Sequence, residues 1–364
     1  MKDTKNLIKN IIFILIINVL FFVFLEGLFS TTLVLRDFIS KVNPEIERLH
    51  AKYDNLLGWI NIPNHEVKDL YGPGVYLKTN SQSFRNDKDF DVKVPKDKIR
   101  IICTGDSFAL GFGVDNEHTW CEQLVSIDKR LETVNLGQGG YGIDQAYLRY
   151  MRDGKKLEHD ILLFTFIADD FNRIQYDNLS GGYSKPVLKL VNDELVVNNI
   201  PVPRYSYLFP QLVKGYVSRF EEFRIYQVFQ RIGKKNIFTK KDMYLGAFNN
   251  ETKEIALKIF DNLQKVNKNG KVLVLVYLPT DEEYIEYQPV TNLWRNWLGT
   301  EMPKREILYF DLYDEFLNVP FAEAVTLFNA KDKHYSNKGN RFIARALYKR
   351  LNSLGLISKI TREN

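Results

Sequence analysis

A serine, a histidine and an aspartate that lie far apart in the chain carry the side chains best suited to chemistry. Ser107 follows the apolar run 99–104, where a predicted strand gives way to a predicted helix. His334 is one of five histidines in the 364-residue sequence, and Asp332 lies close before it. Serine catalysis needs a base that takes the hydroxyl proton and a group that orients the base. The three residues could fill these roles, but Asp332 or Ser336 could instead cap a helix that leaves His334 on the surface.

A glycine-rich stretch is the second candidate for chemistry. VNLGQGGYGIDQ, Val134–Gln145, follows a predicted strand that ends at Asn135. Glycines such as Gly137 and Gly140 allow a backbone to approach a ligand closely, and N–H groups there could donate to an oxyanion. Neither GxxxxGK[ST] nor GxGxxG is present, which argues against a phosphate loop. A tight turn between a strand and a helix is the remaining alternative.

Strand-like and helix-like stretches alternate along the body of the chain, which predicts a parallel sheet covered by helices on both faces. In such a sheet the carboxyl ends of the strands form the ligand-binding edge, so we expect Ser107 to lie there. The predicted strands are 99–104, 133–136, 160–167, 271–278 and 307–312. The predicted helices are 117–131, 143–154, 252–266, 281–297 and 337–354.

A long insertion separates the third and fourth predicted strands. It has roughly eighty residues, which is far more than a typical connection. Within it, VLKLVNDELVVNN predicts a hairpin that turns at Asn192 and Asp193. The stretch IPVPRYSYLFP, residues 200–210, could form a lid or a substrate wall, or could simply cover an apolar face.

The amino terminus carries an apolar run, Ile11–Leu25, in which Asn18 is the one polar residue. Lys2, Lys5 and Lys9 precede the run, and this bias predicts a cytoplasmic amino terminus and an exported body. With its flanks the run reaches the ~20 residues that a membrane-spanning helix needs. A cleaved signal peptide and a buried core helix are the alternatives. Because no small-x-small cleavage site follows, we expect an uncleaved anchor.

The composition argues against several other functions. The net charge of +5 is the difference between 50 basic and 45 acidic residues, and no long basic block concentrates it, so we do not expect nucleic-acid binding. Two histidines at helical ligand spacing are absent from the sequence, so we expect neither a catalytic metal nor another cofactor. Cys103 and Cys121 lie in apolar predicted elements, and we expect two buried free thiols.

Together these residues resemble the SGNH, or GDSL, hydrolase superfamily. The resemblance implies an α/β, flavodoxin-like three-layer sandwich with a central parallel sheet, to which the amino-terminal transmembrane helix is added. It also implies an acyl-enzyme on Ser107, with His334 as base and Asp332 as its orienting group. The G-x-S-x-G elbow of the α/β-hydrolases is absent, since Ala109 replaces its last glycine. The matching blocks are Gly105-Asp106-Ser107 with Gly111 downstream, then Asn135, Gly137 and Gly140, and finally Asp332-Lys333-His334 followed by Gly339.

One block departs from the family pattern. The family places an asparagine after the third strand to complete the oxyanion hole, but FTFIADDFNR has Asp169 at that position and Asp170 after it. An ionised carboxylate cannot donate a hydrogen bond. Three explanations compete: Asp169 is protonated by burial, Asn172 supplies the amide, or the site is weak or inactive. The backbone N–H groups of Ser107 and Gly140 are the other expected donors.

The resemblance implies an extracytoplasmic, membrane-anchored serine esterase or O-acyltransferase. The acyl-enzyme would pass its acyl group to water or to a sugar hydroxyl, and a lipid esterase is a variant of the same function. The alternative is a catalytically inactive SGNH domain that binds glycan or acts as a scaffold in a surface-polysaccharide pathway. We expect three parts: a cytoplasmic tip and anchor at 1–35, a loop-rich segment packed on the body at 36–98, and an SGNH-like domain at 99–354 with its insertion at about 171–250.

The segment Leu77–Phe90, LKTNSQSFRNDKDF, also resembles membrane-anchored SGNH proteins of surface-polysaccharide pathways. That resemblance implies an O-acylated, and above all O-acetylated, glycan as substrate, and polysaccharide-pathway proteins as partners. An aromatic content of 13% suits sugar stacking. The alternative for this segment is an ordinary solvated turn.

Overall fold

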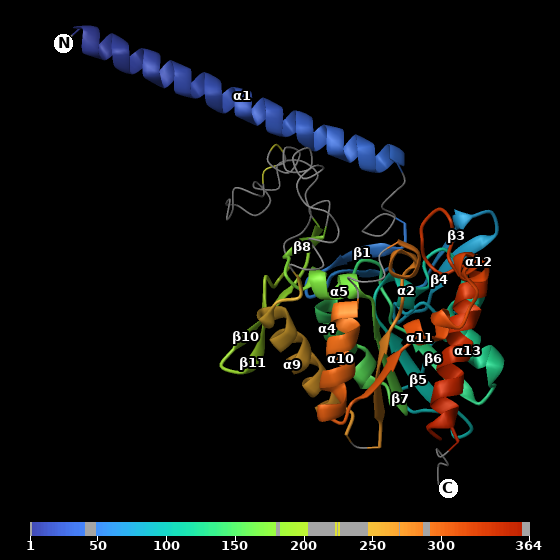
Figure 1. Cartoon of the computed structure of the whole chain (residues 1–364). Helices are drawn as coiled ribbons and strands as arrows, with labels where there is room; N and C mark the ends of the chain where they lie inside the picture. The colour runs from blue at the N-terminus through green and yellow to red at the C-terminus, as the bar shows by residue number, and fades with distance from the viewer. Residues whose placement is uncertain are drawn as a thin grey trace.

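A five-stranded parallel sheet forms the centre of the body (Figure 1). The computed structural model describes residues 2–40, 49–179, 183–202, 223, 225, 247–268, 270–286 and 292–358. The strands are β5 (Ile99–Thr104), β6 (Leu131–Asn135), β7 (Ile161–Phe166), β12 (Val272–Tyr277) and β13 (Leu308–Asp311). All five predicted strands are therefore present, with ends that differ by one or two residues.

The order of the strands fixes the place where a ligand can bind. The sheet runs β13-β12-β7-β5-β6, which is the flavodoxin-like order, and all its neighbouring strands are parallel. The chain reverses its direction across the sheet between β5 and β7, and ligands of such folds bind at the carboxyl ends of the strands at this point. Ser107 follows β5 directly, so it lies at the switch point.

Helices cover both faces of the sheet, which confirms the predicted three layers. Alternate residues of β5 enter different cores: Ile101 packs with Trp120 and Leu347 on one face, and Ile102 packs with Phe260 and Trp294 on the other. Figure 1 shows α13 on one side of the body and α4, α9 and α10 on the other. The first face carries α3 (Trp120–Ile127) and α13 (Asn337–Ser353), and the second carries α4 (Ile143–Arg152), α9 (Asn250–Val266) and α10 (Asn292–Lys304).

Shorter elements surround this sandwich. Residues 49–98 contain two hairpins, formed by β1 (Ala51–Asp54) with β2 (Gly58–Asn61) and by β3 (His65–Gly72) with β4 (Val75–Thr79). Among the described residues, the other helices are α2 (Ser107–Leu110), α5 (Ala168–Arg173), α11 (Tyr313–Leu317), α12 (Phe321–Ala324) and 3-10 turns at Asn116–His118, Gly154–Lys156 and Val325–Leu327. The remaining strands are β8 (Asn178–Leu179), β9 (Tyr183–Ser184), β10 (Val187–Val191) and β11 (Glu194–Asn198).

Two predicted helices differ from those in the structure. The helix expected at 117–131 ends at Ile127, because Asp128 begins a turn in which its carbonyl accepts from the N–H of Leu131, the first residue of β6. Within the helix expected at 281–297, the described residues form a π-helical turn, Glu282–Glu286, and the start of α10, which extends to Lys304. Residues 287–291 lie outside the described part.

The predicted hairpin in the insertion is confirmed. β10 and β11 pair in antiparallel fashion around Asn192 and Asp193, whose φ angles are 50° and 63°. Two positive φ angles in sequence give a turn whose twist matches that of the flanking strands. Residues 203–210 of the stretch interpreted as a lid, a wall or a cover lie outside the described residues.

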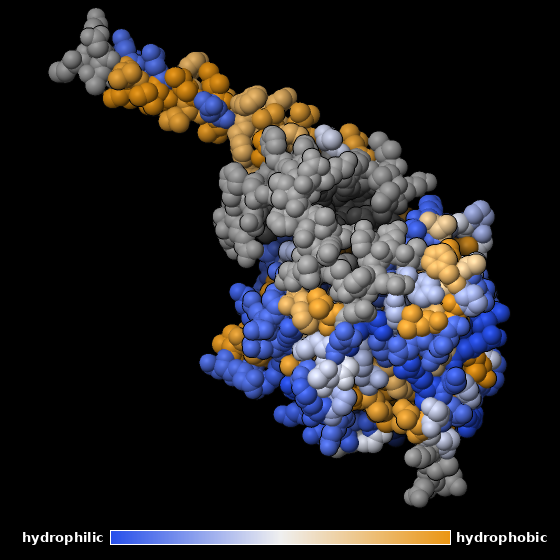
Figure 2. Space-filling view, viewed as in Figure 1, coloured by the Kyte–Doolittle hydropathy of each residue, from blue (hydrophilic) through white to orange (hydrophobic). Residues whose placement is uncertain are grey.

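The amino-terminal helix α1 (Lys2–Ser40) is long and apolar enough to cross a membrane. Its span Lys5–Thr32 has 28 residues, with a mean hydropathy of 2.8 over its most apolar 18 residues, and a bilayer needs about 20 residues. Figure 2 shows α1 as a largely hydrophobic rod, whereas the visible surface of the body is mostly hydrophilic. The helix also touches the insertion, since Ile225 N–H donates to the Glu26 carboxylate at 2.9 Å and the Phe22 and Phe223 rings lie 5.0 Å apart.

Both cysteines are buried and free, as expected. Cys103 on β5 and Cys121 on α3 face one another with their sulfur atoms 2.6 Å apart. Burial and the neighbouring thiol raise the pKa of Cys103, so this thiol remains protonated in the core.

The fully buried His50 makes folding sensitive to acid. Burial lowers the pKa of its imidazole from 6.5 to about 4, although the Asn61 side chain at 3.1 Å opposes the shift. Between pH 6.5 and pH 4 the imidazole is therefore protonated in the unfolded chain but not in the folded chain. The free energy of unfolding is unaffected by this difference above pH 6.5 and decreases as the pH falls toward 4. We expect His50→Gln to remove about 3 kcal/mol of that pH dependence. Thermal unfolding of both proteins from pH 7 to 4 checks this, and a Tm difference that does not change with pH would contradict it.

Candidate active site

The serine lies on a sharply constrained turn. Gly105 follows β5 directly, and a Cβ at this position would lie 2.6 Å from the Thr165 carbonyl oxygen of β7, so only glycine fits beside the neighbouring strand. The Asp106 carboxylate then caps the short helix α2 by accepting from the Phe108 N–H at 2.8 Å. These contacts place the Ser107 hydroxyl at the first position of α2, at the carboxyl edge of the sheet.

The structure brings Ser107 and His334 together across 227 positions of sequence. His334 Nε2 lies 2.8 Å from Ser107 Oγ, and His334 Nδ1 lies 2.9 Å from the backbone carbonyl of Asp332. A carbonyl can only accept, so the hydrogen-bond network assigns the proton to Nδ1 and leaves the lone pair of Nε2 directed at the hydroxyl. This is the tautomer that a general base needs.

We predicted that the Asp332 carboxylate orients the imidazole, but in the structure the backbone carbonyl of Asp332 accepts from the ring nitrogen. Its carboxylate Oδ1 is 3.6 Å from Nδ1 and accepts instead from the backbone N–H of His334 at 3.0 Å. The turn around Lys333, with φ at 65°, aims the carbonyl rather than the carboxylate at the ring. Burial alone would raise the pKa of Asp332, but hydrogen bonds and the charge of His334 outweigh it and lower the pKa. The anion is therefore close enough to stabilise a protonated imidazole.

Two aromatic rings hold the imidazole, and the sequence analysis did not identify them. The centroids of Phe108 and Phe112 lie 4.7 and 4.6 Å from that of His334, at interplanar angles of 34° and 36°. Both belong to α2 and the turn after it, so the segment that carries the nucleophile also holds the base. Their position next to Ser107 in the sequence was the available signal.

The glycine-rich loop packs directly on the nucleophile helix. Asn135 Nδ2 donates to the Ala109 carbonyl at 3.0 Å, and a Cβ on Gly137 would lie 2.2 Å from the Leu110 nitrogen. Within the described residues, the N–H groups of Ser107 and Gly140 donate to no other group of the chain. Both are therefore free to donate to a bound group.

Asp169 does not take the role of the family asparagine. Its side chain is 32% exposed and pairs with Arg173 at 2.8 Å, so the structure contradicts the explanation that burial protonates it. The Asn172 side chain is buried, and its Nδ2 donates to Asp169 Oδ1 at 3.4 Å. The structure thus directs the Asn172 amide toward Asp169. Arg173 offsets the negative charge that would repel an oxyanion.

Arg173 is a second functional residue that the sequence analysis missed. Its Nη1 lies 2.7 Å from Asp170 and 3.4 Å from Asp106, the residue that precedes the serine. Burial lowers the pKa of Arg173, but the three carboxylates outweigh it and raise the pKa. Burial and the Asp106 charge raise the pKa of Asp170, and Arg173 opposes them. The spacing of 169 and 170 from 173 on one helix was a signal for this cluster.

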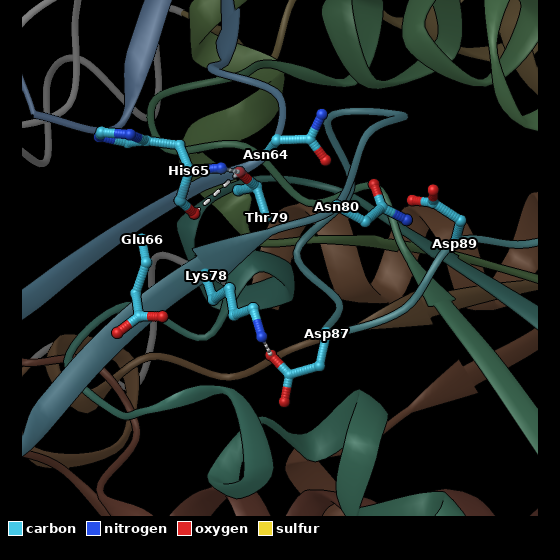
Figure 3. A pocket seen from close by; sticks show the side chains of 8 residues that line it. All are labelled: Asn64, His65, Glu66, Lys78, Thr79, Asn80, Asp87 and Asp89. Atoms are coloured by element: carbon cyan, nitrogen blue, oxygen red, sulfur yellow. Dashed lines mark hydrogen bonds and ion pairs between the residues drawn. The ribbon is translucent and has the colours of Figure 1, made fainter.

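A polar pocket of about 340 Å³ lies on the β3–β4 hairpin, apart from Ser107 and His334 (Figure 3). Figure 3 shows Lys78 directed at Asp87, and their charged atoms are 4.0 Å apart. Asp89 accepts from Ser81, and the Asn80 amide donates to the Lys88 carbonyl. Local hydrogen bonds therefore occupy much of this polar lining. In the described part of the chain, no group of three His, Cys, Asp or Glu side chains could hold a metal ion.

We compared this chain with known protein families, curated proteins and solved structures. No family model matches the chain, and no curated protein matches it either. Among solved structures, a lipolytic G-D-S-L family member from Veillonella parvula is 11% identical, with 70% of this chain and 98% of that chain covered and a TM-score of 0.38. A lipase/acylhydrolase from Enterococcus faecalis is 11% identical, with 70% and 96% covered and a TM-score of 0.39. An acetylxylan esterase from Geobacillus stearothermophilus is 13% identical, with 71% and 96% covered and a TM-score of 0.37. The solved structures to which this chain is similar thus include G-D-S-L lipolytic proteins and an acetylxylan esterase.

Proposed function

We propose that this chain is a membrane-anchored serine esterase, or a related O-acyltransferase, that acts on acyl esters of glycans outside the cytoplasm. The observation that carries the proposal is the 2.8 Å hydrogen bond between Ser107 Oγ and His334 Nε2. A serine whose proton is directed at a neutral imidazole is the arrangement that nucleophilic acyl transfer needs.

The first half of the reaction forms an acyl-enzyme. His334 Nε2 takes the hydroxyl proton as Ser107 Oγ attacks the ester carbonyl, and the carbonyl oxygen becomes an oxyanion. The backbone N–H groups of Ser107 and Gly140 donate to this oxygen. The Asp332 carbonyl and carboxylate stabilise the protonated imidazole, which then gives its proton to the leaving alkoxide as the ester bond breaks.

The second half decides between esterase and transferase. Water, or a sugar hydroxyl, gives its proton to His334 and attacks the acyl carbon on Ser107, and the proton returns to Ser107 Oγ as the acyl group leaves. Hydrolysis releases a carboxylic acid, and transfer produces a new ester. The chemistry is the same in both, so access of water or an acceptor to the acyl-enzyme determines the outcome.

The class of substrate and the location rest on other features. The acyl chemistry is supported by the site, and the glycan, with acetyl as its acyl group, by the resemblance of Leu77–Phe90 to membrane-anchored SGNH proteins. The lysines at the start of α1, before its apolar run, support a cytoplasmic amino terminus and an external body.

A fluorophosphonate tests the proposal, because it phosphonylates only an activated serine. We expect intact mass spectrometry of the full chain in detergent to show one adduct, and none on Ser107→Ala. In a second experiment, unlabelled enzyme is incubated with a panel of O-acetylated glycans, and the released acetate is measured. If the wild type forms no adduct, the esterase proposal fails, and the Asp169 departure then favours the alternative of an inactive glycan-binding or scaffolding domain.

A further inference from the structure

We propose that Arg85 and Asn86 are positioning residues that hold the nucleophile loop and the glycine loop in their catalytic relation. The inference rests on the proposed function and deepens it, because it assigns a role to the segment Leu77–Phe90. The solvated turn considered for this segment is wrong at its centre, since Phe84, Arg85 and Asn86 are buried.

Arg85 binds the chain that follows the nucleophile. Its Nη1 donates to the carbonyls of Leu110 at 2.8 Å and Gly111 at 2.5 Å, and its Nη2 donates to the Val114 carbonyl. Its Nε donates to Asn116 Oδ1 at 3.1 Å. One planar guanidinium thus fixes the end of α2 and the whole turn after it, which a single ammonium point charge could not do with the same geometry.

This turn carries Phe112, one of the two rings against His334. Gly111 N–H and Phe112 N–H both donate to the Ser107 carbonyl at 3.0 Å, so the turn is also tied to the nucleophile. Tyr71 from β3 packs on the outer side of Phe112, with ring centroids 4.6 Å apart. A displaced Arg85 would therefore loosen the position of the base as well as the turn.

Asn86 holds the second loop. Its Oδ1 accepts from the Asn135 N–H at 2.9 Å, and its Nδ2 donates to the Thr133 carbonyl at 3.1 Å. The Arg85 N–H adds a bond to the Asn135 carbonyl at 3.0 Å. Arg85 and Asn86 therefore connect the segment after Ser107 to the end of β6, from which the chain continues to Gly140. Through these contacts they set the spacing of the two backbone donors of the oxyanion hole.

Burying the charged Arg85 side chain costs hydration free energy, so the contacts that it makes must compensate this loss. The residue is 2% exposed, and within the described part of the chain it has no carboxylate at ion-pair distance. Amide carbonyl oxygens and the Tyr71 ring, whose centroid lies 5.9 Å from the guanidinium carbon, compensate its lost hydration instead. Arg100 offers a matched comparison. It is 1% exposed and also donates to backbone carbonyls, but it lies at the amino end of β5 and pairs with Glu132 at 2.7 Å.

The experiment compares R85K with R100K in the full chain. We measure kcat, KM and the pH profile of kcat/KM for p-nitrophenyl acetate, the rate of fluorophosphonate labelling, and Tm in detergent. For R85K we expect kcat and the labelling rate to fall about 100-fold with little change in KM, and the acid limb of the pH profile to shift, because the base and the oxyanion donors move. For R100K we expect a lower Tm with kcat and the pH profile unchanged.

The outcomes separate this inference from the proposed function. Folded R85K with wild-type kcat and pH profile overturns the inference, and so does an equal loss of kcat in R100K. If R85K does not fold, N86A takes its place, with a loss of kcat at constant KM expected and an unchanged kcat contradicting the inference. A wild type that forms no fluorophosphonate adduct overturns the proposed function, and the positioning role with it.

Discussion

Alanine at His334 is expected to lower kcat for an activated ester by about 10⁴-fold or more. The imidazole is the base that the Ser107 hydroxyl contacts, at 2.8 Å, and without it the serine must ionise unaided. KM is expected to change far less, because the ring contributes to the reaction rather than to the binding of the ester. Steady-state kinetics of the purified full chain check the loss, and the same change at the half-buried His65 on β3 serves as control.

Asp332 distinguishes this geometry from that of a triad in which the carboxylate alone orients the base. Because the backbone carbonyl of Asp332 holds Nδ1–H at 2.9 Å, Asp332→Ala retains that contact. We therefore expect a loss of only about 100-fold, below the ~10⁴-fold typical where the carboxylate fixes the tautomer. Equal losses for the alanine variants of His334 and Asp332 would contradict this assignment.

Alanine at Gly137 is expected to damage stability and activity together. The added Cβ would lie 2.2 Å from the Leu110 nitrogen and 2.5 Å from the Ala109 carbonyl carbon, and neither backbone atom can rotate away. The glycine loop and α2 must then separate, at a cost of about 1–3 kcal/mol in the free energy of unfolding. The shift displaces the donors at Ser107 and Gly140, so we expect kcat to fall about 100-fold.

Gly299→Ala is the matched control for this substitution. Gly299 lies within α10, and a Cβ there would meet nothing within 4 Å. Alanine favours a helix over glycine by up to about 1 kcal/mol, so Tm should rise or stay the same, with kcat unaffected. The comparison uses Tm in detergent and kcat for both variants. A Gly137 variant that behaves like the Gly299 variant would show that the two loops are not in rigid contact.

The departure at Asp169 gains a physical explanation from Arg173. The sequence places a carboxylate where the family has an amide donor, and on that ground alone an oxyanion would be repelled. The structure pairs that carboxylate with Arg173, which also reaches Asp106 beside the nucleophile. Arg173 therefore offsets the charge of Asp169, and the backbone N–H groups of Ser107 and Gly140 have no acceptor within the described part of the chain.

The sequence by itself determined the elements and the chemistry of single residues. The stretch of β5 predicts a strand because Ile99, Ile101, Ile102 and Cys103 form a short apolar run that Gly105 ends. Asn192-Asp193 predicts a hairpin because both residues accept a positive φ angle. The candidate roles of Ser107 and His334 follow from the chemistry of their side chains. These signals are local, so they can be detected without knowledge of the fold.

The tertiary structure alone decided how those residues meet. The order of the strands and the path of each turn set the distance between Ser107 and His334. They also set the direction of the Asp332 carbonyl and the packing of Phe108 and Phe112 on the imidazole. Arg85 shows most clearly what the sequence could not predict. The four acceptors that it binds lie 25 to 31 positions away, on turns whose course no local pattern encodes. Side-chain type sets what a residue can do, and the packing of distant segments sets whether it has a partner.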